Sequence, residues 1–284
     1  MDCKIDPRQY IKQLDSASDD SICLAYAALG FATMGAKPMR FYTQHLDELV
    51  AATDAYYRNI DGPIQLLQDY GDAHKQLHCL QSIIFEQFQY HGNRESYDEL
   101  ENADLCAVID RRKGMPIAIS IICIHVANAL GWNVSGIAMP GHFLCRLEAN
   151  GERIVFDPFN KAKPLDAPEL RALIKQALGP EAELQPQYYE SVSNRMVLLR
   201  LQNNIKLRQV ENREYIDALL TLKTMRKIAP DEASLLLDSG QLYALSDQPK
   251  AAVDMLNTYL KLAPAGYDRS RAEILLQSLK KQLN

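Results

Sequence analysis

The stretch that decides the fold runs from Arg111 to Asp157 and is written RRKGMPIAISIICIHVANALGWNVSGIAMPGHFLCRLEANGERIVFD. Its first part predicts a helix that begins at Pro116, because proline suits a first helical position, and that ends before Gly131. Apolar side chains surround this helix on almost every side, which is the pattern of a helix buried in a core. They are Ile117, Ile119, Ile121, Ile122, Ile124, Val126, Ala127 and Leu130.

Three short apolar runs after this helix predict strands, at Val134–Ala138, Phe143–Leu147 and Arg153–Phe156. Turns at Met139-Pro140-Gly141 and Ala149-Asn150-Gly151 separate the runs. A helix buried on all sides, followed by an antiparallel sheet, forms the core of an α+β domain.

This order of elements resembles the transglutaminase-like branch of the papain-type cysteine hydrolases. The resemblance matches Gly131 to the glycine after the helix, His142 to the family's histidine and Asp157 to its aspartate before proline. Fifteen residues before Gly131, where the resemblance implies the nucleophilic cysteine, the chain has Pro116. Proline carries no nucleophile, so the chain keeps the implied base and carboxylate but lacks the atom that attacks.

Three longer segments carry a closer resemblance: NADLCAVIDRRKGMPIAIS, PGHFLCR and DPFN. They are similar to a bacterial family that joins a transglutaminase-like core to C-terminal tetratricopeptide-like repeats, and some of its members are labelled invasion regulators of the SirB type. The resemblance implies a papain-type helical domain with a small antiparallel sheet, followed by all-α hairpins. It fixes the fold far better than the biochemical activity.

Composition limits the classes of partner. The chain has 284 residues, a net charge of −5 and no basic block, so we expect no binding to nucleic acid. No run reaches about 18 apolar residues, and the first residues lack the apolar centre of a signal peptide, so we expect no membrane segment. Six cysteines without CxxC spacing then indicate reduced thiols in a cytoplasmic protein. The oligomeric state is not indicated.

The first hundred residues predict helices. Apolar spacing favours Ser21–Thr33, Phe41–Arg58, a helix opened by Pro63, His74–Tyr90 and a short helix Asn102–Ile109. A polar loop follows the fourth of these.

Histidines in two of the predicted helices raise the question of a metal. His74 and His78 are spaced to bind a metal on one helix face, with Cys79 adjacent, but no third ligand stands at a recognisable spacing. We therefore favour a solvent-facing or capping role and expect neither a metal nor a cofactor. His125 is interpreted as a packed histidine of the core helix.

The C-terminal part has a period. Pro230 and Pro264 are 34 residues apart, as in tetratricopeptide repeats, and each ends a similar phrase. Gly240 and Ala252 would let two helices of one hairpin approach closely, and Arg269–Leu283 predicts a closing helix. Such repeats either bind a protein or peptide partner or serve as helical scaffolding, and both interpretations stay open.

A short helix, Ala167–Leu178, precedes a polar stretch that contains Pro186. This stretch favours a boundary between a transglutaminase-like domain, residues 1–185, and the repeats, residues 193–284.

The candidate catalytic residues are His142 and Asp157, which we predict to be joined by a hydrogen bond, directly or through one water. Ser120, one turn beyond the helix start, is the best substitute nucleophile, although a serine within a helix more often bonds to its own backbone. Cys123 lies deeper in the apolar helix, and Cys145 points to the opposite strand face from His142.

The sequence leaves two hypotheses for the function of the chain. The first is a non-catalytic regulatory or protein-interaction protein, and the missing cysteine favours it. The alternative is an amide hydrolase or acyltransferase that uses His142 and Asp157 with an atypical nucleophile such as Ser120. The basic cluster Arg111-Arg112-Lys113 either binds an anion near the site or is a solvated or carboxylate-paired surface.

Overall fold

The computed structural model describes residues 5–60 and 71–283, and the helix predicted from Pro63 lies outside them. The chain divides into two compact units. One comprises Met1–Gln13 and Ala17–Leu198, and the other comprises Leu14–Ser16 and Leu199–Asn284. The division falls within helix α8, Asn194–Glu211.

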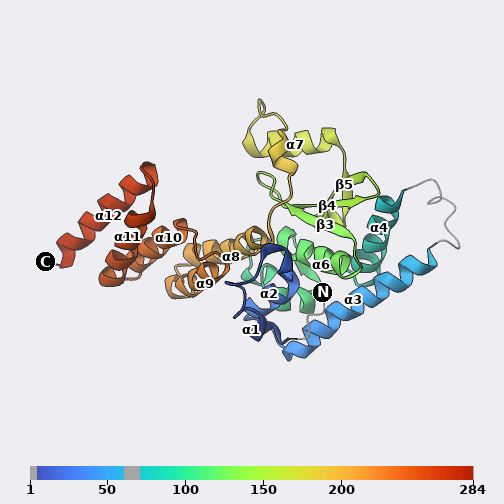
Figure 1. The fold of residues 1–284 in the computed structure, drawn as a ribbon, viewed down its shortest axis with the longest axis horizontal. Coiled ribbons are helices and arrows are strands. Elements are labelled where there is room, and N and C mark those ends of the chain that lie inside the picture. The colour runs from blue at the N-terminus through green and yellow to red at the C-terminus, as the bar shows by residue number, and fades with distance from the viewer. Residues whose placement is uncertain (1–4, 61–70, 284) are drawn as a thin grey trace. The chain divides into compact units, whose positions relative to one another are not determined.

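Helices build the first part of the larger unit (Figure 1). They are α1 Pro7–Tyr10, η1 Asp19–Ser21, α2 Leu24–Phe31, α3 Met39–Asn59 and α4 Asp72–Leu80. The predicted helix His74–Tyr90 is α-helical only as far as Leu80 and continues as a π-helix, η3 Gln81–Gln87.

A short helical turn, η4 Leu100–Asn102, leads into α5 Leu105–Arg111. Helix α5 begins later than predicted because the Asp104 side chain caps it, accepting a hydrogen bond from the Ala107 amide at 3.1 Å. Two strands of two residues, β1 His91–Gly92 and β2 Lys113–Gly114, form a parallel ladder that the sequence did not predict.

Helix α6, Pro116–Ala129, is the centre of this unit. Ten of its fourteen residues are buried, and it packs against α2, α3, α5 and the sheet, which confirms the predicted core helix. Gly131 follows its end with φ +77°, a conformation that favours glycine.

The sheet behind α6 has the order β3-β4-β5-β6, and all neighbours are antiparallel. Its strands are β3 Asn133–Ile137, β4 Leu144–Ala149, β5 Glu152–Asp157 and β6 Lys163–Leu165. Asn150 and Gly151 connect β4 to β5 with positive φ at both positions, as a type I′ hairpin turn requires. Strand β6 was missed because it contains Pro164, which is tolerated here at the sheet edge.

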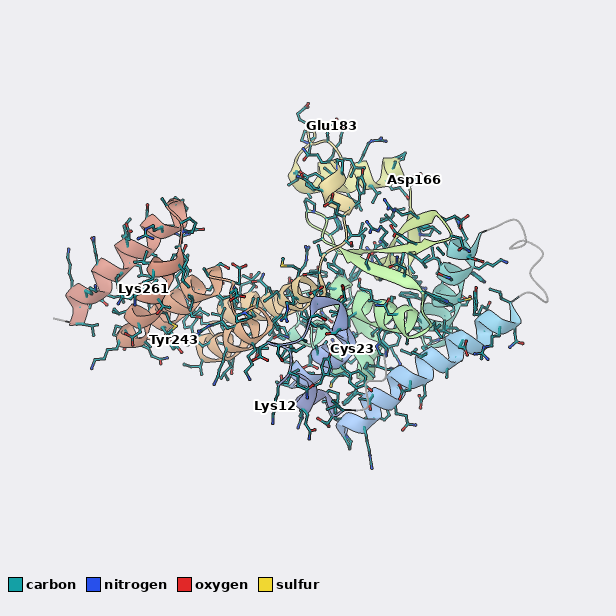
Figure 2. All side chains as sticks on the ribbon, in the orientation of Figure 1. Lys12, Cys23, Asp166, Glu183, Tyr243 and Lys261 are labelled. Carbon is teal, nitrogen blue, oxygen red and sulfur yellow. The ribbon has the colours of Figure 1, made fainter. Side chains whose placement is uncertain are left out.

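Helices cover both faces of this sheet. Helix α7, Ala167–Leu178, begins at a capping box of Asp166 and Glu169, and Asp166 is labelled in Figure 2. It packs Leu170 and Ile174 on Leu144 of β4. Because side chains alternate along a strand, the next residue, Cys145, faces α6 instead. Two short turns complete the unit, η5 Pro158–Asn160 and η6 Pro186–Tyr189.

From residue 199 to 283, helices are the only regular secondary structure of the described chain. After α8 come α9 Tyr215–Ile228, α10 Ser234–Leu245, α11 Pro249–Leu262 and α12 Tyr267–Leu283. A Cβ at Gly240 would lie 2.8 Å from the Leu256 side chain and 3.5 Å from the Ala252 carbonyl, so the predicted close approach of α10 and α11 is confirmed.

Within the described ranges, none of the helices combines the length and apolar character that crossing a membrane requires.

Candidate functional site

The beginning of α6 is held by backbone and amide groups from the segment before it. The Met115 amide donates to the Asn102 carbonyl at 2.9 Å, and the Asn93 amide donates to the Gly114 carbonyl at 3.0 Å. Both asparagines are buried, and the Asn93 side chain donates to the Asn102 side chain at 2.9 Å. Pro116 therefore starts the helix in a fixed position, where the resemblance implies a nucleophile.

Ser120 is sealed within the core. It has 0% exposure, and its hydroxyl donates to the Pro116 carbonyl at 2.8 Å, one turn back along the helix. The predicted tendency of a helical serine to bond to its own backbone is confirmed. Its hydroxyl is also within hydrogen-bond reach of the Cys145 thiol, across the contact between α6 and β4.

The cysteines near this helix are also sealed. Burial raises the pKa of the Cys145 thiol to about 12, an effect that exceeds the lowering by the Ser120 hydroxyl. Burial raises the pKa of Cys123 well above its usual value, and that of Cys106 to about 12. Because the thiolate is the reactive form, none of these three thiols is activated.

The two retained residues lie at ends of neighbouring strands. His142 is half-buried in the turn before β4, where its backbone amide donates to the Met139 carbonyl at 3.0 Å. Asp157 ends β5 and is 9% exposed. Its carboxylate accepts from the Phe159 amide at 2.9 Å and from the Asn160 side-chain amide. A carboxylate oxygen can accept more than one hydrogen bond, so these two contacts leave room for His142, and its pairing with Asp157 stays a prediction.

Sequence reasoning missed the groups that extend the Asp157 turn. The Arg94 guanidinium donates to the Asn160 side chain and lies 5.3 Å from the centre of the Phe159 ring. The Tyr97 ring packs on Phe159 edge-on, with centres 5.9 Å apart. A Cβ at Gly92 would lie 2.3 Å from the Phe159 ring, so glycine is needed there. The segment DPFN supplies the ring of Phe159 and the amide of Asn160 to these contacts, in addition to the carboxylate of Asp157.

The basic cluster before α6 is engaged within the fold. Arg111 pairs with Glu99 at 3.2 Å and with Glu101 at 2.6 Å. Of the two interpretations of the basic cluster, Arg111 therefore fits the one in which the charge is paired with carboxylates, and not the one in which it binds an anion. Lys113 lies in β2.

Arg112 adopts a positive φ of 59° and turns toward the core. Its guanidinium donates to the Tyr90 hydroxyl at 3.0 Å and lies 2.9 Å from His45 Nε2. Burial, followed by the charge of Arg112, lowers the pKa of His45 to about 4. The neutral imidazole can thus accept a hydrogen bond from the arginine.

The histidines of α4 have separate partners. His74 Nδ1 lies 3.9 Å from the Glu152 carboxylate, and His78 Nε2 lies 3.3 Å from the Tyr56 hydroxyl. Among the residues that the structure describes, no three histidine, cysteine or acidic side chains are grouped as metal ligands.

Comparisons with known proteins agree with this architecture. Residues 40–203 match the transglutaminase-like superfamily, and residues 205–277 match a tetratricopeptide repeat family. A UPF0162 protein of Xylella fastidiosa is 32% identical over 188 residues, which cover 65% of this chain and 67% of that protein.

Two further relatives differ in how much they share. Protein SirB1 of Salmonella typhimurium is 23% identical over 228 residues, covering 80% of this chain and 81% of its own length. The human F-box only protein 21 is 30% identical over 180 residues, which cover 59% of this chain but 27% of that protein. The superfamily match spans more than half of the chain and coincides with the helix α6 and sheet just described, so this protein belongs to the transglutaminase-like superfamily and continues into tetratricopeptide repeats.

Proposed function

We propose that this chain is a non-catalytic regulatory protein whose repeats bind a peptide segment of a partner protein. A groove between α10 and α12 carries the proposal. It has a volume of about 710 Å³ and includes the side chains of Leu245 and Ile274, which are 57% and 69% exposed. Exposed apolar side chains that line a concave surface are typical of an interaction site.

The charge of the groove favours an acidic peptide with apolar side chains. Arg271 is the charged residue of its lining, among glutamine, serine, alanine, leucine and isoleucine. The helix that carries it, α12, has four basic and two acidic residues. A partner segment that combines one or two apolar anchors with a carboxylate would match this surface.

The chemistry around α6 supports a non-catalytic role. Ser120 is buried and bonded to the Pro116 carbonyl, and burial raises the pKa values of Cys123 and Cys145. The alternative, hydrolysis or acyl transfer by His142 and Asp157, would require a nucleophile that reaches the substrate from outside this set.

Binding can be tested with a displayed peptide library selected on the intact chain, followed by affinity measurement of the selected peptides by fluorescence anisotropy. Leu245→Asp and Ile274→Asp should each weaken binding about tenfold or more, the usual cost of losing an interface anchor. Leu220→Asp is the matched control, because Leu220 is 59% exposed on α9 and outside the groove. Equal losses in all three variants would contradict the proposed groove.

A parallel screen for amide and ester hydrolysis tests the alternative function, a hydrolase or acyltransferase. We expect no turnover above that of buffer. Turnover that is lost in both His142→Ala and Ser120→Ala would establish the hydrolase instead.

A further inference from the structure

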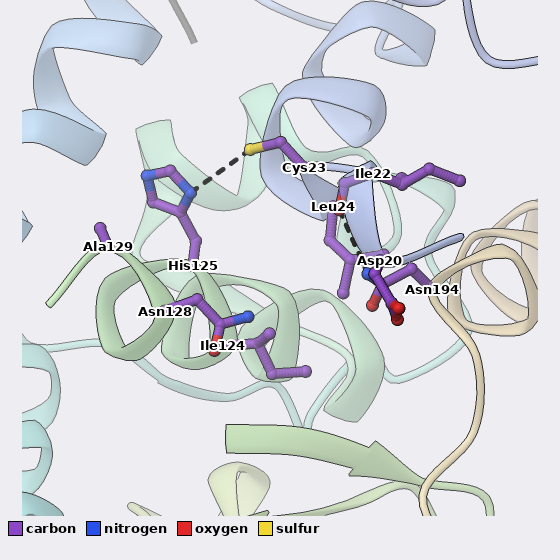
Figure 3. Close-up of a pocket in the computed structure, with 9 residues that line it drawn as sticks. All are labelled: Asp20, Ile22, Cys23, Leu24, Ile124, His125, Asn128, Ala129 and Asn194. Atoms are coloured by element: carbon purple, nitrogen blue, oxygen red, sulfur yellow. Dashed lines mark hydrogen bonds between the residues drawn. The ribbon is translucent and has the colours of Figure 1, made fainter. Parts of the chain in front are cut away.

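A cavity lies on the side of α6 that faces α2 (Figure 3). Its volume is about 190 Å³. Ile22, Leu24 and Ile124 form a buried apolar floor, while Asp20 and Asn128 are exposed residues of its lining. An apolar cavity of about 150 Å³ holds a benzene molecule, so this space admits a small organic molecule with one polar end.

A thiol and an imidazole meet at this cavity. Cys23, labelled in Figure 2, precedes the first residue of α2, and its Sγ lies 3.7 Å from His125 Nδ1 (Figure 3). Burial lowers the pKa of His125 to about 4, so the ring is neutral at pH 7. With its proton on Nε2, the ring presents Nδ1 as an acceptor for the thiol proton.

Cys23 differs from the other described cysteines in access. It is 9% exposed and lines the cavity, whereas Cys79, Cys106, Cys123 and Cys145 are 0–2% exposed. Burial raises the pKa of each of those four thiols. A small molecule that enters the cavity therefore meets Cys23 with a proton acceptor beside it.

We propose that Cys23 is a modification site that small hydroperoxides oxidise, with His125 as the proton acceptor. The Cys23 sulfur attacks the terminal oxygen of the peroxide, so that an S–O bond forms and the O–O bond breaks. The thiol proton passes through His125 to the departing oxygen, which leaves as an alcohol or, from hydrogen peroxide, as water. The thiol is oxidised to a sulfenic acid and the peroxide is reduced.

Hydroperoxides fit the site better than larger electrophiles do. The reaction requires only a nucleophilic sulfur, a proton acceptor and space for a short organic group, and the apolar floor supplies that space. A peptide disulfide is too large for a cavity of about 190 Å³.

The intact chain should be treated with hydrogen peroxide or tert-butyl hydroperoxide in the presence of dimedone, which traps sulfenic acids, and its peptides analysed by mass spectrometry. Cys23 should be trapped about tenfold faster or more than Cys79 or Cys106. His125→Gln should slow trapping at Cys23 about tenfold or more, since it removes the proton acceptor. Cys106→Ser is the matched control and should leave the Cys23 rate unchanged.

A second variant tests the cavity without touching the pair. Ala129→Phe, at the exposed end of α6, should fill the cavity. It should slow the oxidation of Cys23 by tert-butyl hydroperoxide more than the oxidation by hydrogen peroxide. The comparison of the two peroxides in Ala129→Phe tests the proposed site even if His125→Gln does not fold. Trapping spread evenly over the cysteines, or equal slowing of both peroxides by Ala129→Phe, would overturn the proposal.

Discussion

Helix α6 presents two faces that carry similar residues in different surroundings. Toward the sheet, Ser120 and Cys123 meet Cys145, and all three are 0% exposed. Toward α2, His125 meets Cys23 beside a cavity. The two faces therefore differ in access and in whether an imidazole lies beside the thiol.

The resemblance to cysteine hydrolases draws attention to the sheet-facing side, where the helix starts with Pro116. That side is packed as a core. The face that retains access to solvent carries His125, more than two turns further along the helix. No motif of the resemblance includes this residue.

The largest expected effect comes from placing one charge on each face. Ser120→Lys should lower the free energy of unfolding by about 3–5 kcal/mol, because it buries an ammonium group without a partner. Ala129→Lys, on the exposed side, should change it by less than about 0.5 kcal/mol. The single tryptophan, Trp132, lies just after α6, so urea unfolding followed by its fluorescence measures this unit alone. Similar losses for both variants would contradict the contrast.

The second prediction concerns pH and the cavity face. At a pH well above 6.5, His125 is neutral in both the folded and the unfolded chain and contributes no pH dependence. Burial lowers the folded-state pKa to about 4, so between pH 6.5 and 4 the unfolded chain binds a proton that the folded chain does not. Stability should therefore fall as the pH falls through this window, by up to about 3 kcal/mol from this residue.

The measurement is urea unfolding at pH 7 and at pH 4.5, for the wild type and for His125→Gln. The variant should lose less stability on acidification than the wild type does. His45, whose pKa is also lowered to about 4, remains in both chains and so cancels in the comparison. An identical loss in the two chains would mean that His125 is charged in the folded state.

Local patterns were sufficient to predict α6, the hairpin at Asn150-Gly151 and the helical repeats. In each case the determining residues are close in sequence: apolar spacing around α6, two turn residues between strands, and prolines one repeat apart. The close approach at Gly240 was predictable for the same reason.

Features that depend on distant residues were not predictable. Cys23 and His125 are separated by 102 positions, and His125 was interpreted only as a packed histidine. Arg94 and Asn160 meet across 66 positions. The parallel ladder of β1 and β2 also joins separate segments, and its strands of two residues are too short to leave a pattern.

The third prediction concerns His142, in the turn that precedes β4. If its predicted bond to Asp157 is structural, His142→Ala should lower the free energy of unfolding by about 1–3 kcal/mol, the cost of a buried partner left unsatisfied. Peptide binding by the repeats should be unchanged. Unchanged stability together with loss of a hydrolytic activity would instead assign the pair to catalysis.

The smallest expected effect compares two single-atom changes, one on each face. Cys145→Ser places a hydroxyl in a core with 0% exposure, where the Ser120 hydroxyl can satisfy only part of its hydrogen bonding, so it should cost about 1–2 kcal/mol. Cys23→Ser should cost less than about 0.5 kcal/mol, because the cavity leaves its hydroxyl access to water. Trp132 fluorescence in urea measures both. The order of the two losses is the sharpest test, since the atoms exchanged are the same and only the surroundings differ. A larger loss for Cys23→Ser would mean that the cavity face is packed as tightly as the face toward the sheet.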